Sequence, residues 1–249
     1  MITLSNGRKI NYMTASGAMG FRGRGWLWEW PLMAAGLIDL SLFDAISLRT
    51  ITVEPRYHPT SNHSWWKPWT WMPGSPWACW RTIEDGIINK IGLYNPGLEH
   101  WCDWIGPSLC DSPVPLIASI QGTKDECAHL AKTVSMYDVI GIEVNGSCPN
   151  ATHGVSEADE MVQCTIAAKN NTHLPVIYKA SVAQDYMTIA RELRGVAEAI
   201  TFNSVPYKMV FPDNKSPLEK IGKPKGVGGG VSGKAAQKLN WEAQAKLSQ

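Results

Sequence analysis

The sequence Ile142-Glu143-Val144-Asn145-Gly146-Ser147-Cys148-Pro149-Asn150 carries the most structural information in this chain. It continues an apolar run that starts at Val139 and ends in a turn at a proline, which is typical of a buried strand that leads into a functional loop. The amides of Asn145 and Asn150 both donate and accept hydrogen bonds, which suits a planar ligand with imide and carboxylate groups. Cys148 between them can take or give a proton. We therefore interpret this segment as a strand that ends at an active site.

Similar short apolar segments alternate with helical patterns along the chain. The candidate strands are 11–14, 44–48, 115–120, 139–145, 175–180 and 199–203. Capping boxes at Thr123-x-x-Glu126 and Ser181-x-x-Gln184 predict two helix starts, and 156–169 and 234–247 predict two further helices. Alternating strands and helices predict an α/β fold with a parallel sheet, and this many repeats favours a (β/α)8 TIM barrel over a sandwich.

The repeats do not fill a complete barrel. About six βα units are found, whereas the closed barrel has eight. Either two strands lie in the Trp-rich region or the last two βα units are missing, and we favour the second interpretation. We expect one barrel domain over 1–249, with an N-terminal hairpin at 3–13 whose Asn6-Gly7 predicts a type I′ turn. The open parallel edges of such a sheet also favour self-association, so a homodimer is an option.

A Trp-rich insertion occupies about 63–80. Its tryptophans are interrupted by Pro68, Pro73 and Pro76, and this proline density excludes a regular helix or a central strand. Two interpretations stay open: a loop that packs its indoles onto the barrel, or a lid or partner surface.

Composition limits the class of protein. The chain has 249 residues, of which 44% are hydrophobic, and this is enough to bury the core of one domain. A net charge of +1 gives no general attraction to nucleic acid or acidic membranes. No apolar run approaches the ~20 residues of a membrane span, and the N-terminus lacks the features of a signal peptide. The six scattered cysteines favour reduced thiols. We expect a soluble, cytoplasmic protein without nucleic-acid or membrane partners.

Several segments resemble, in order along the chain, motifs of the dihydroorotate dehydrogenase family. They are Thr14-Ala15-Ser16-Gly17, Thr50-Ile51-Thr52-Val53-Glu54-Pro55-Arg56, Asn89-Lys90-Ile91-Gly92-Leu93-Tyr94-Asn95-Pro96-Gly97, Asn145-Gly146-Ser147-Cys148-Pro149-Asn150, and Ile200-Thr201-Phe202-Asn203-Ser204 with Gly228-Gly229-Gly230-Val231-Ser232-Gly233. The resemblance extends to about Ala236. One such match is weak evidence, but this many in the same order are specific.

The resemblance implies an FMN-linked barrel that oxidises dihydroorotate to orotate in pyrimidine biosynthesis, with hydride transfer to the flavin. Cys148 would be the general base, and Lys179 would lie at the pyrimidine edge of the flavin, where a cation stabilises negative charge on the reduced ring. The implied FMN contacts are Ala15, Ser16, Gly17, Arg49, Asn145, Lys179, Ser204 and Gly230. The implied contacts to dihydroorotate or orotate are Arg49, Asn89, Gly92, Leu93, Asn145, Asn150, Asn203 and Ser204. No metal is expected.

The chain departs from the family pattern at two places. Arg49 stands where the family usually has lysine, which keeps the charge but replaces a compact ammonium with a wider planar group. The loops after strands seven and eight, which hold the flavin phosphate in the family, are not found. Cysteine in the Ser-Cys-Pro-Asn sequence resembles the soluble class, which uses fumarate or an NAD-linked partner subunit, and the electron acceptor stays open.

Other functions remain as alternatives. One is a flavoenzyme that acts on another dihydropyrimidine-like ring, and another is an incomplete, non-catalytic barrel. Residues 228–234 also fit the opening of a phosphate-binding P-loop, but Ala235 replaces the Ser or Thr that binds magnesium. His100, Cys102 and Cys110 lack a spacing typical of zinc ligands.

Overall fold

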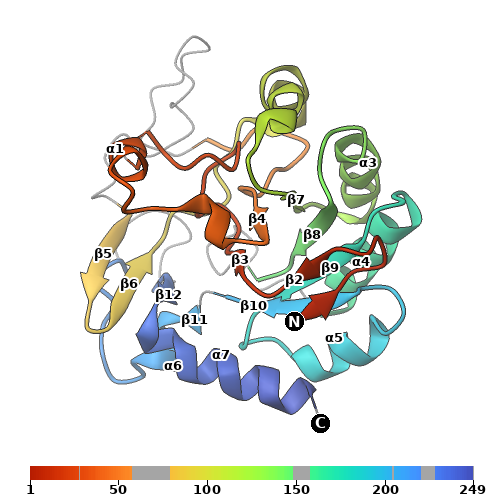
Figure 1. Cartoon of the computed structure of the whole chain (residues 1–249). Coiled ribbons are helices and arrows are strands. Elements are labelled where there is room, and N and C mark those ends of the chain that lie inside the picture. Colours follow the sequence, from red (N-terminus) through yellow and green to blue (C-terminus); the bar gives the residue numbers. More distant parts are fainter. Residues whose placement is uncertain (28, 58–78, 148–157, 204, 220–227, 249) are drawn as a thin grey trace.

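A curled sheet of six parallel strands forms the centre of the fold (Figure 1). The computed structural model describes residues 1–27, 29–57, 79–147, 158–203, 205–219 and 228–248. The strand order is β10-β9-β8-β7-β4-β3, and the bounds are β3 Met13–Thr14, β4 Ala45–Ser47, β7 Leu116–Ile120, β8 Gly141–Asn145, β9 Val176–Ala180 and β10 Ala199–Phe202. Each strand lies within one of the six segments predicted from the sequence. The predicted fold class, an incomplete (β/α) barrel, is confirmed.

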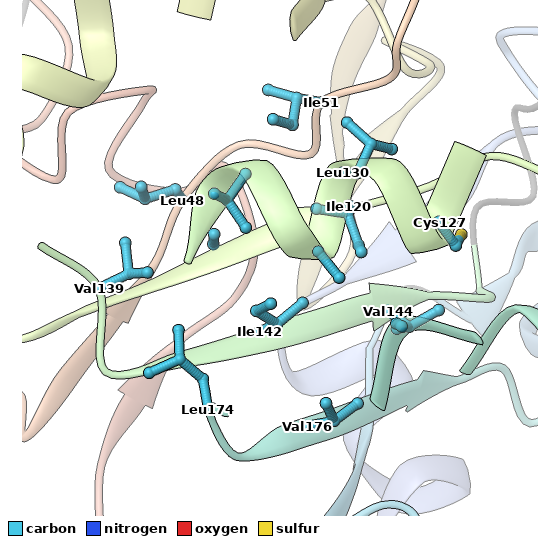
Figure 2. Close-up of a cluster of buried hydrophobic side chains, with 14 of the residues drawn as sticks. Leu48, Ile51, Ile120, Cys127, Leu130, Val139, Ile142, Val144, Leu174 and Val176 are labelled. Atoms are coloured by element: carbon cyan, nitrogen blue, oxygen red, sulfur yellow. The ribbon is translucent and has the colours of Figure 1, made fainter. Parts of the chain in front are cut away.

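Helices cover the outer face of this sheet (Figure 1). They are α3 Lys124–Val134, α4 Ala158–Asn170 and α5 Tyr186–Glu192, whereas α7 Lys234–Leu247 packs against β10 and against the second sheet described below. In α3 the buried residues recur with helical spacing at Cys127, Leu130, Ala131 and Val134. Figure 2 shows this helix packed on the strands in the main hydrophobic core.

The two predicted capping boxes have different outcomes. Thr123 and Glu126 form the complete reciprocal pair at the start of α3, as predicted. The helix start predicted at Ser181 is wrong, because α5 begins at Tyr186 and is capped by Asp185. Ser181 accepts from the backbone of Ala183 and forms a local turn instead.

The predicted N-terminal hairpin corresponds to β1 (Ile2–Thr3) and β2 (Lys9–Ile10). Its turn is not type I′, which needs two left-handed residues: Gly7 has φ +80°, whereas Asp85 is the one described non-glycine residue with positive φ. The backbone of Leu4 donates to Arg8 and accepts from Gly7, so the turn consists of residues 5–7, which fits a type I turn with a glycine bulge. The hairpin places Leu4 and Ile10 against inward residues at the N-terminal ends of the strands.

A second, antiparallel sheet was not predicted. Its order is β11-β12-β6-β5, with bounds β5 Trp80–Ile83, β6 Gly86–Asn89, β11 Val205–Pro206 and β12 Gly230–Ser232. Glu84 and Asp85 join β5 to β6, and Asp85-Gly86 is a strong hairpin signal in the sequence. β5 begins at Trp80, the last residue of the Trp-rich insertion, and it is an edge strand of this sheet, which agrees with the predicted exclusion of a central strand. Residues 58–78 lie outside the described part.

The remaining described elements are short. They are α1 (Trp30–Ala34), a 3-10 helix (Leu40–Leu42), α2 (Gly97–His100), a π-helix (Trp101–Ile105), a second 3-10 helix (Gly106–Asp111) and α6 (Tyr207–Val210). Among the described residues, no helix is long and apolar enough to cross a membrane. A cavity of about 770 Å³ lies between the outer strands β3 and β10 and is also lined by α7, as expected for a barrel sheet that does not close.

Candidate active site

Buried polar side chains gather at the C-terminal ends of the parallel strands. Ser119 pairs with Glu143 in register, and Asn145 pairs with Lys179. All four residues are at most 7% exposed. Since side chains alternate between the two faces of a strand, Lys179 lies on the same face as Ile177. Along the strand, the inward-facing side chains therefore change from apolar to polar within two residues.

These strand ends form one wall of a cavity of about 480 Å³. The loop after β3 and residues of the antiparallel sheet form the other walls. Its lining residues are Ala15, Ser16, Gly17, Ala18, Arg49, Thr50, Trp80, Ile87, Asn89, Ile91, Gly92, Leu93, Asn145, Ser147, Lys179, Asn203 and Ser232. A largely apolar cavity with a few convergent polar groups is typical of a small-molecule site.

A chain of hydrogen bonds runs behind the cavity wall. Ser16 Oγ lies 2.9 Å from Thr50 Oγ1, and Thr50 Oγ1 lies 2.8 Å from Ser119 Oγ. Ser119 Oγ donates to Glu143 Oε1 over 3.0 Å. Asn145 Nδ2 donates to Thr50 Oγ1 over 2.8 Å. These hydrogen bonds link side chains from two parallel strands, β7 and β8, and from two loops into one network.

Two further contacts fix the strand-end residues. Asn145 Oδ1 accepts from the backbone N–H and the hydroxyl of Ser147, both at 3.3 Å, which fixes the orientation of the amide. Lys179 Nζ lies 3.9 Å from Glu143 Oε1, and both side chains are almost fully buried. Lys179 is therefore a buried cation at the cavity wall with a carboxylate behind it.

Arg49 is held by its surroundings. Its Nε donates to the carbonyl of Tyr94 over 2.9 Å, and its Nη2 donates to the carbonyl of Gly92 over 3.2 Å. The guanidinium also lies 5.9 Å from the ring centroid of Phe21. A single ammonium cannot reproduce this planar arrangement, so Arg49 shapes the loop that follows β6.

That loop is stabilised by Asn95, which is fully buried. Its Nδ2 donates to Thr52 Oγ1 and to the carbonyl of Leu93, and its Oδ1 accepts from the backbone of Gly97. Gly92 has φ +75°, a left-handed conformation that favours glycine. Through Asn95, the loop that follows β6 is therefore bonded to Thr52 in the segment after β4.

Tyr178 fills the space beside Gly146. A Cβ built on Gly146 would lie 2.6 Å from Tyr178 Cζ. Burial raises the pKa of Tyr178 to about 12, so the phenol is neutral. Gln184 Nε2 donates to the carbonyl of Gly146 over 3.0 Å, and the loop after β8 is thus held on both sides.

Burial shifts the pKa of two titratable groups near the antiparallel sheet. Burial raises the pKa of Cys79 to about 11, against the charges of Arg49 and Arg81. Burial also lowers the pKa of Lys90, which is 2% exposed, and Glu219 opposes this shift. Cys79 is therefore a neutral thiol. No group of three or more candidate metal ligands occurs in the part of the chain that the structure describes.

Most of the predicted site residues are brought together. Those that line the cavity are Ala15, Ser16, Gly17, Arg49, Asn89, Gly92, Leu93, Asn145, Lys179 and Asn203. Gly230 is not among the lining residues: it lies in β12, where its carbonyl accepts from Asn89 Nδ2 over 3.4 Å. Cys148, Asn150 and Ser204 lie outside the described residues.

The sequence interpretation missed several lining residues. They are Ala18, Thr50, Trp80, Ile87, Ile91, Ser147 and Ser232. Thr50, Ile91, Ser147 and Ser232 were inside quoted motifs, and only their place on the cavity wall was not recognised. Trp80 and Ile87 lie on the β5–β6 hairpin, for which Asp85-Gly86 was the available signal.

The fold and this site define a class of protein. A parallel (β/α) sheet with its cavity at the C-terminal strand ends is the arrangement of (β/α) barrel enzymes. The family model described as dihydroorotate dehydrogenase matches residues 73–248. The chain belongs to the dihydroorotate dehydrogenase family of oxidoreductases.

Curated relatives agree with this assignment. The chain is 31% identical over 237 residues to a protein from Caldicellulosiruptor saccharolyticus, covering 91% of this chain and 68% of the relative. It is 32% identical over 234 residues to one from Desulforudis audaxviator, covering 90% and 66%. Both relatives are named dihydroorotate dehydrogenase B (NAD(+)), catalytic subunit. The chain spans about two thirds of the length of these relatives.

Proposed function

We propose that this chain supports the FMN-dependent oxidation of dihydroorotate to orotate. The observation that carries the proposal is the convergence of Lys179, Asn145, Ser16 and Arg49 on one cavity, in a chain that belongs to this family. Loss of a proton from carbon and transfer of two electrons need a base, an acceptor and groups that hold a planar product. Flavin, when bound, would supply the electron acceptor.

The described residues fit the ring end of a flavin. The cavity wall offers a buried cation at Lys179 and an oriented amide at Asn145. In the loop after β3, Gly17 has no side chain, so its backbone itself lines the cavity. We propose that Ala15, Ser16 and Gly17 lie against the ring, and that Lys179 holds its pyrimidine edge, where a fixed cation stabilises developing negative charge.

The substrate would lie beside the ring. We propose that Asn89, Asn145 and Asn203 hold its polar edges, with Asn150 and Ser204. The base would be Cys148, three residues beyond Asn145. Arg49 fixes the carbonyls of Gly92 and Tyr94, so we infer that it sets the shape of the substrate wall. A different dihydropyrimidine-like substrate is the second candidate, because the arginine changes this wall from the family pattern.

The names of the relatives include NAD(+) and a catalytic subunit. We therefore propose that electrons pass from this chain to an NAD-linked partner subunit. The predicted domain organisation remains a proposal as well. Residues of both β3 and β10 line one cavity, and we expect two added βα units from a family relative to strengthen FMN binding through a phosphate site.

The direct test combines FMN titration with anaerobic reduction by dihydroorotate. Flavin fluorescence reports binding, and bleaching of flavin absorbance after mixing reports the chemical step. Reduction by dihydroorotate supports the proposal. Binding without reduction rejects this substrate, and a chain that binds no FMN even after extension is the non-catalytic barrel.

Two variants test the roles of individual residues. Cys148→Ala should slow flavin reduction by about 10²–10⁴ while substrate binding is largely kept. Lys179→Met should lower the midpoint potential of the flavin, because the reduced form loses more stabilisation than the oxidised form. Lys132→Met is the matched control, since Lys132 is exposed on α3. Equal potentials in both lysine variants would contradict the placement of Lys179.

A further inference from the structure

Glu143 is a buried carboxylate to which the mechanism above assigns no role. It lies in β8, is 1% exposed, and contacts Ser119 and Lys179. A carboxylate in such a position is costly unless it is paired and hydrogen-bonded. Its contacts are therefore the reason that it is tolerated, and they connect it to the cavity.

The hydrogen bonds of the network have one consistent direction. A carboxylate only accepts hydrogen bonds, so the hydroxyl of Ser119 donates its one hydrogen to Glu143. Thr50 must then donate to Ser119. With its hydrogen used, Thr50 accepts from Asn145 and from Ser16. Glu143 thereby makes Thr50 Oγ1 an acceptor for two cavity residues, Asn145 and Ser16.

The carboxylate also faces the buried cation. Glu143 Oε1 lies 3.9 Å from Lys179 Nζ, and the side-chain exposures are 2% and 8%. Attraction between charges is much stronger in such surroundings than in water. The pair holds the ammonium at the wall shared by both cavities.

We infer that Glu143 is a positioning residue of the active site. It holds Lys179 by charge and orders Asn145 and Ser16 through Ser119 and Thr50. Its effect on a bound flavin rests on the proposed function, and its coupling to Lys179 does not. A negative charge behind the lysine reduces the stabilisation of the reduced, anionic flavin, so Glu143 sets the midpoint potential as well as the geometry.

The first test is a double-mutant cycle in urea unfolding. Glu143→Gln keeps an acceptor for Ser119 and removes the charge, and Lys179→Met removes the cation. Each single variant leaves one buried charge unpaired, so the double variant should lose less stability than the sum of the two losses. Glu143→Gln combined with Lys132→Met is the control and should be additive.

An additive cycle for Glu143 and Lys179 overturns the inference. If Glu143→Gln alone does not fold, recovery of folding in the double variant supports the coupling, and failure to recover rejects it. The cycle needs no ligand, so it decides the coupling even if wild-type chain binds no FMN and the proposed function fails.

The second test uses a readout that a purely structural role would not move. In FMN-bound protein, Glu143→Gln should favour the reduced over the oxidised flavin by about tenfold, which is ~30 mV for a two-electron couple. Lys179→Met should shift the potential in the opposite direction. A potential unchanged by Glu143→Gln overturns the role in setting it.

Discussion

The two ends of the parallel sheet differ in chemistry although the same strands build them. At the N-terminal end the inward residues Ile117 and Ile177 pack with Leu4 and Ile10 of the hairpin. Two residues further along each strand, Ser119 and Lys179 face the same interior, but they are polar. One end of the sheet is sealed by hydrophobic contact, and the other is held by directed hydrogen bonds around a cavity.

The difference shows that one strand can contribute to stability at one end and to the active site at the other. Burial of apolar area needs no particular orientation, so the hairpin end tolerates irregular contacts. The polar end is stable only if each buried donor and acceptor is satisfied. Substitutions at the two ends should therefore fail in different ways, by lost contact at the first and by misfit or misorientation at the second.

The largest effect is expected at the hydrophobic end. Ile177→Ala removes a fully buried side chain and should lower the free energy of unfolding by about 2–5 kcal/mol. Ile87→Ala is the control at the cavity end, where the same residue type is 46% exposed. Urea unfolding measures both. Equal losses would mean that the hairpin end carries no larger share of the stability.

A smaller loss of unfolding free energy is expected where β8 meets the loop that follows it. In Gly146→Ala the new Cβ would meet the buried ring of Tyr178, and overpacking of this kind costs about 1–3 kcal/mol. Tyr178→Phe removes the hydroxyl, which is the nearest atom to that Cβ. The double variant should therefore regain part of the stability lost in Gly146→Ala. A double variant no more stable than Gly146→Ala alone would contradict this steric explanation.

The third effect concerns the start of α3, directly after the C-terminal end of β7. Thr123→Ala removes the cap of the helix and should cost about 1 kcal/mol in urea unfolding. Ser181→Ala is the comparison, because Ser181 matches the same sequence pattern but begins no helix. It should cost less. A larger loss at Ser181 would show that its local turn contributes more than a helix cap.

This pair also shows what the sequence can predict. The parallel strands were predicted because each is a short apolar run whose identity does not depend on distant partners. The Ser181 pattern failed because a serine–glutamine pair also forms a local turn, and only tertiary contacts choose between the two.

The candidate site was partly predictable for a similar reason. Motif residues such as Asn145 and Lys179 end predicted strands, so their meeting at one edge followed from the fold. The β5–β6 hairpin that supplies Trp80 had a local signal, but the pairing of β12 with β6, which supplies Ser232, joins Ile87 to Ser232 across the chain, and no local pattern encodes it. The anchoring of Arg49 by two carbonyls also depends on tertiary structure.

The smallest effect is a dependence on pH at the hydrophobic end. Glu198 accepts from the backbone and the hydroxyl of Ser5, and it pairs with Lys169 at 3.5 Å. Burial alone would raise the pKa of Glu198, but these hydrogen bonds and the lysine lower it below its ordinary value of 4.5. A carboxyl with a lowered pKa stabilises the fold above its unfolded value, and this stabilisation is lost as the pH falls through the folded value.

Wild-type protein should therefore lose its advantage over Glu198→Gln as the pH falls below 4.5. Urea unfolding of both proteins, at about pH 7 and at several values below the ordinary carboxyl pKa, measures the difference. Other carboxyl groups titrate equally in both proteins, so the difference isolates Glu198. The effect should be smaller than that of Thr123→Ala, because the side chain is partly exposed and water competes for its hydrogen bonds. A difference that stays constant with pH would mean that the charge of Glu198 does not hold the hairpin, and that hydrophobic contact by Leu4 and Ile10 alone seals this end of the sheet.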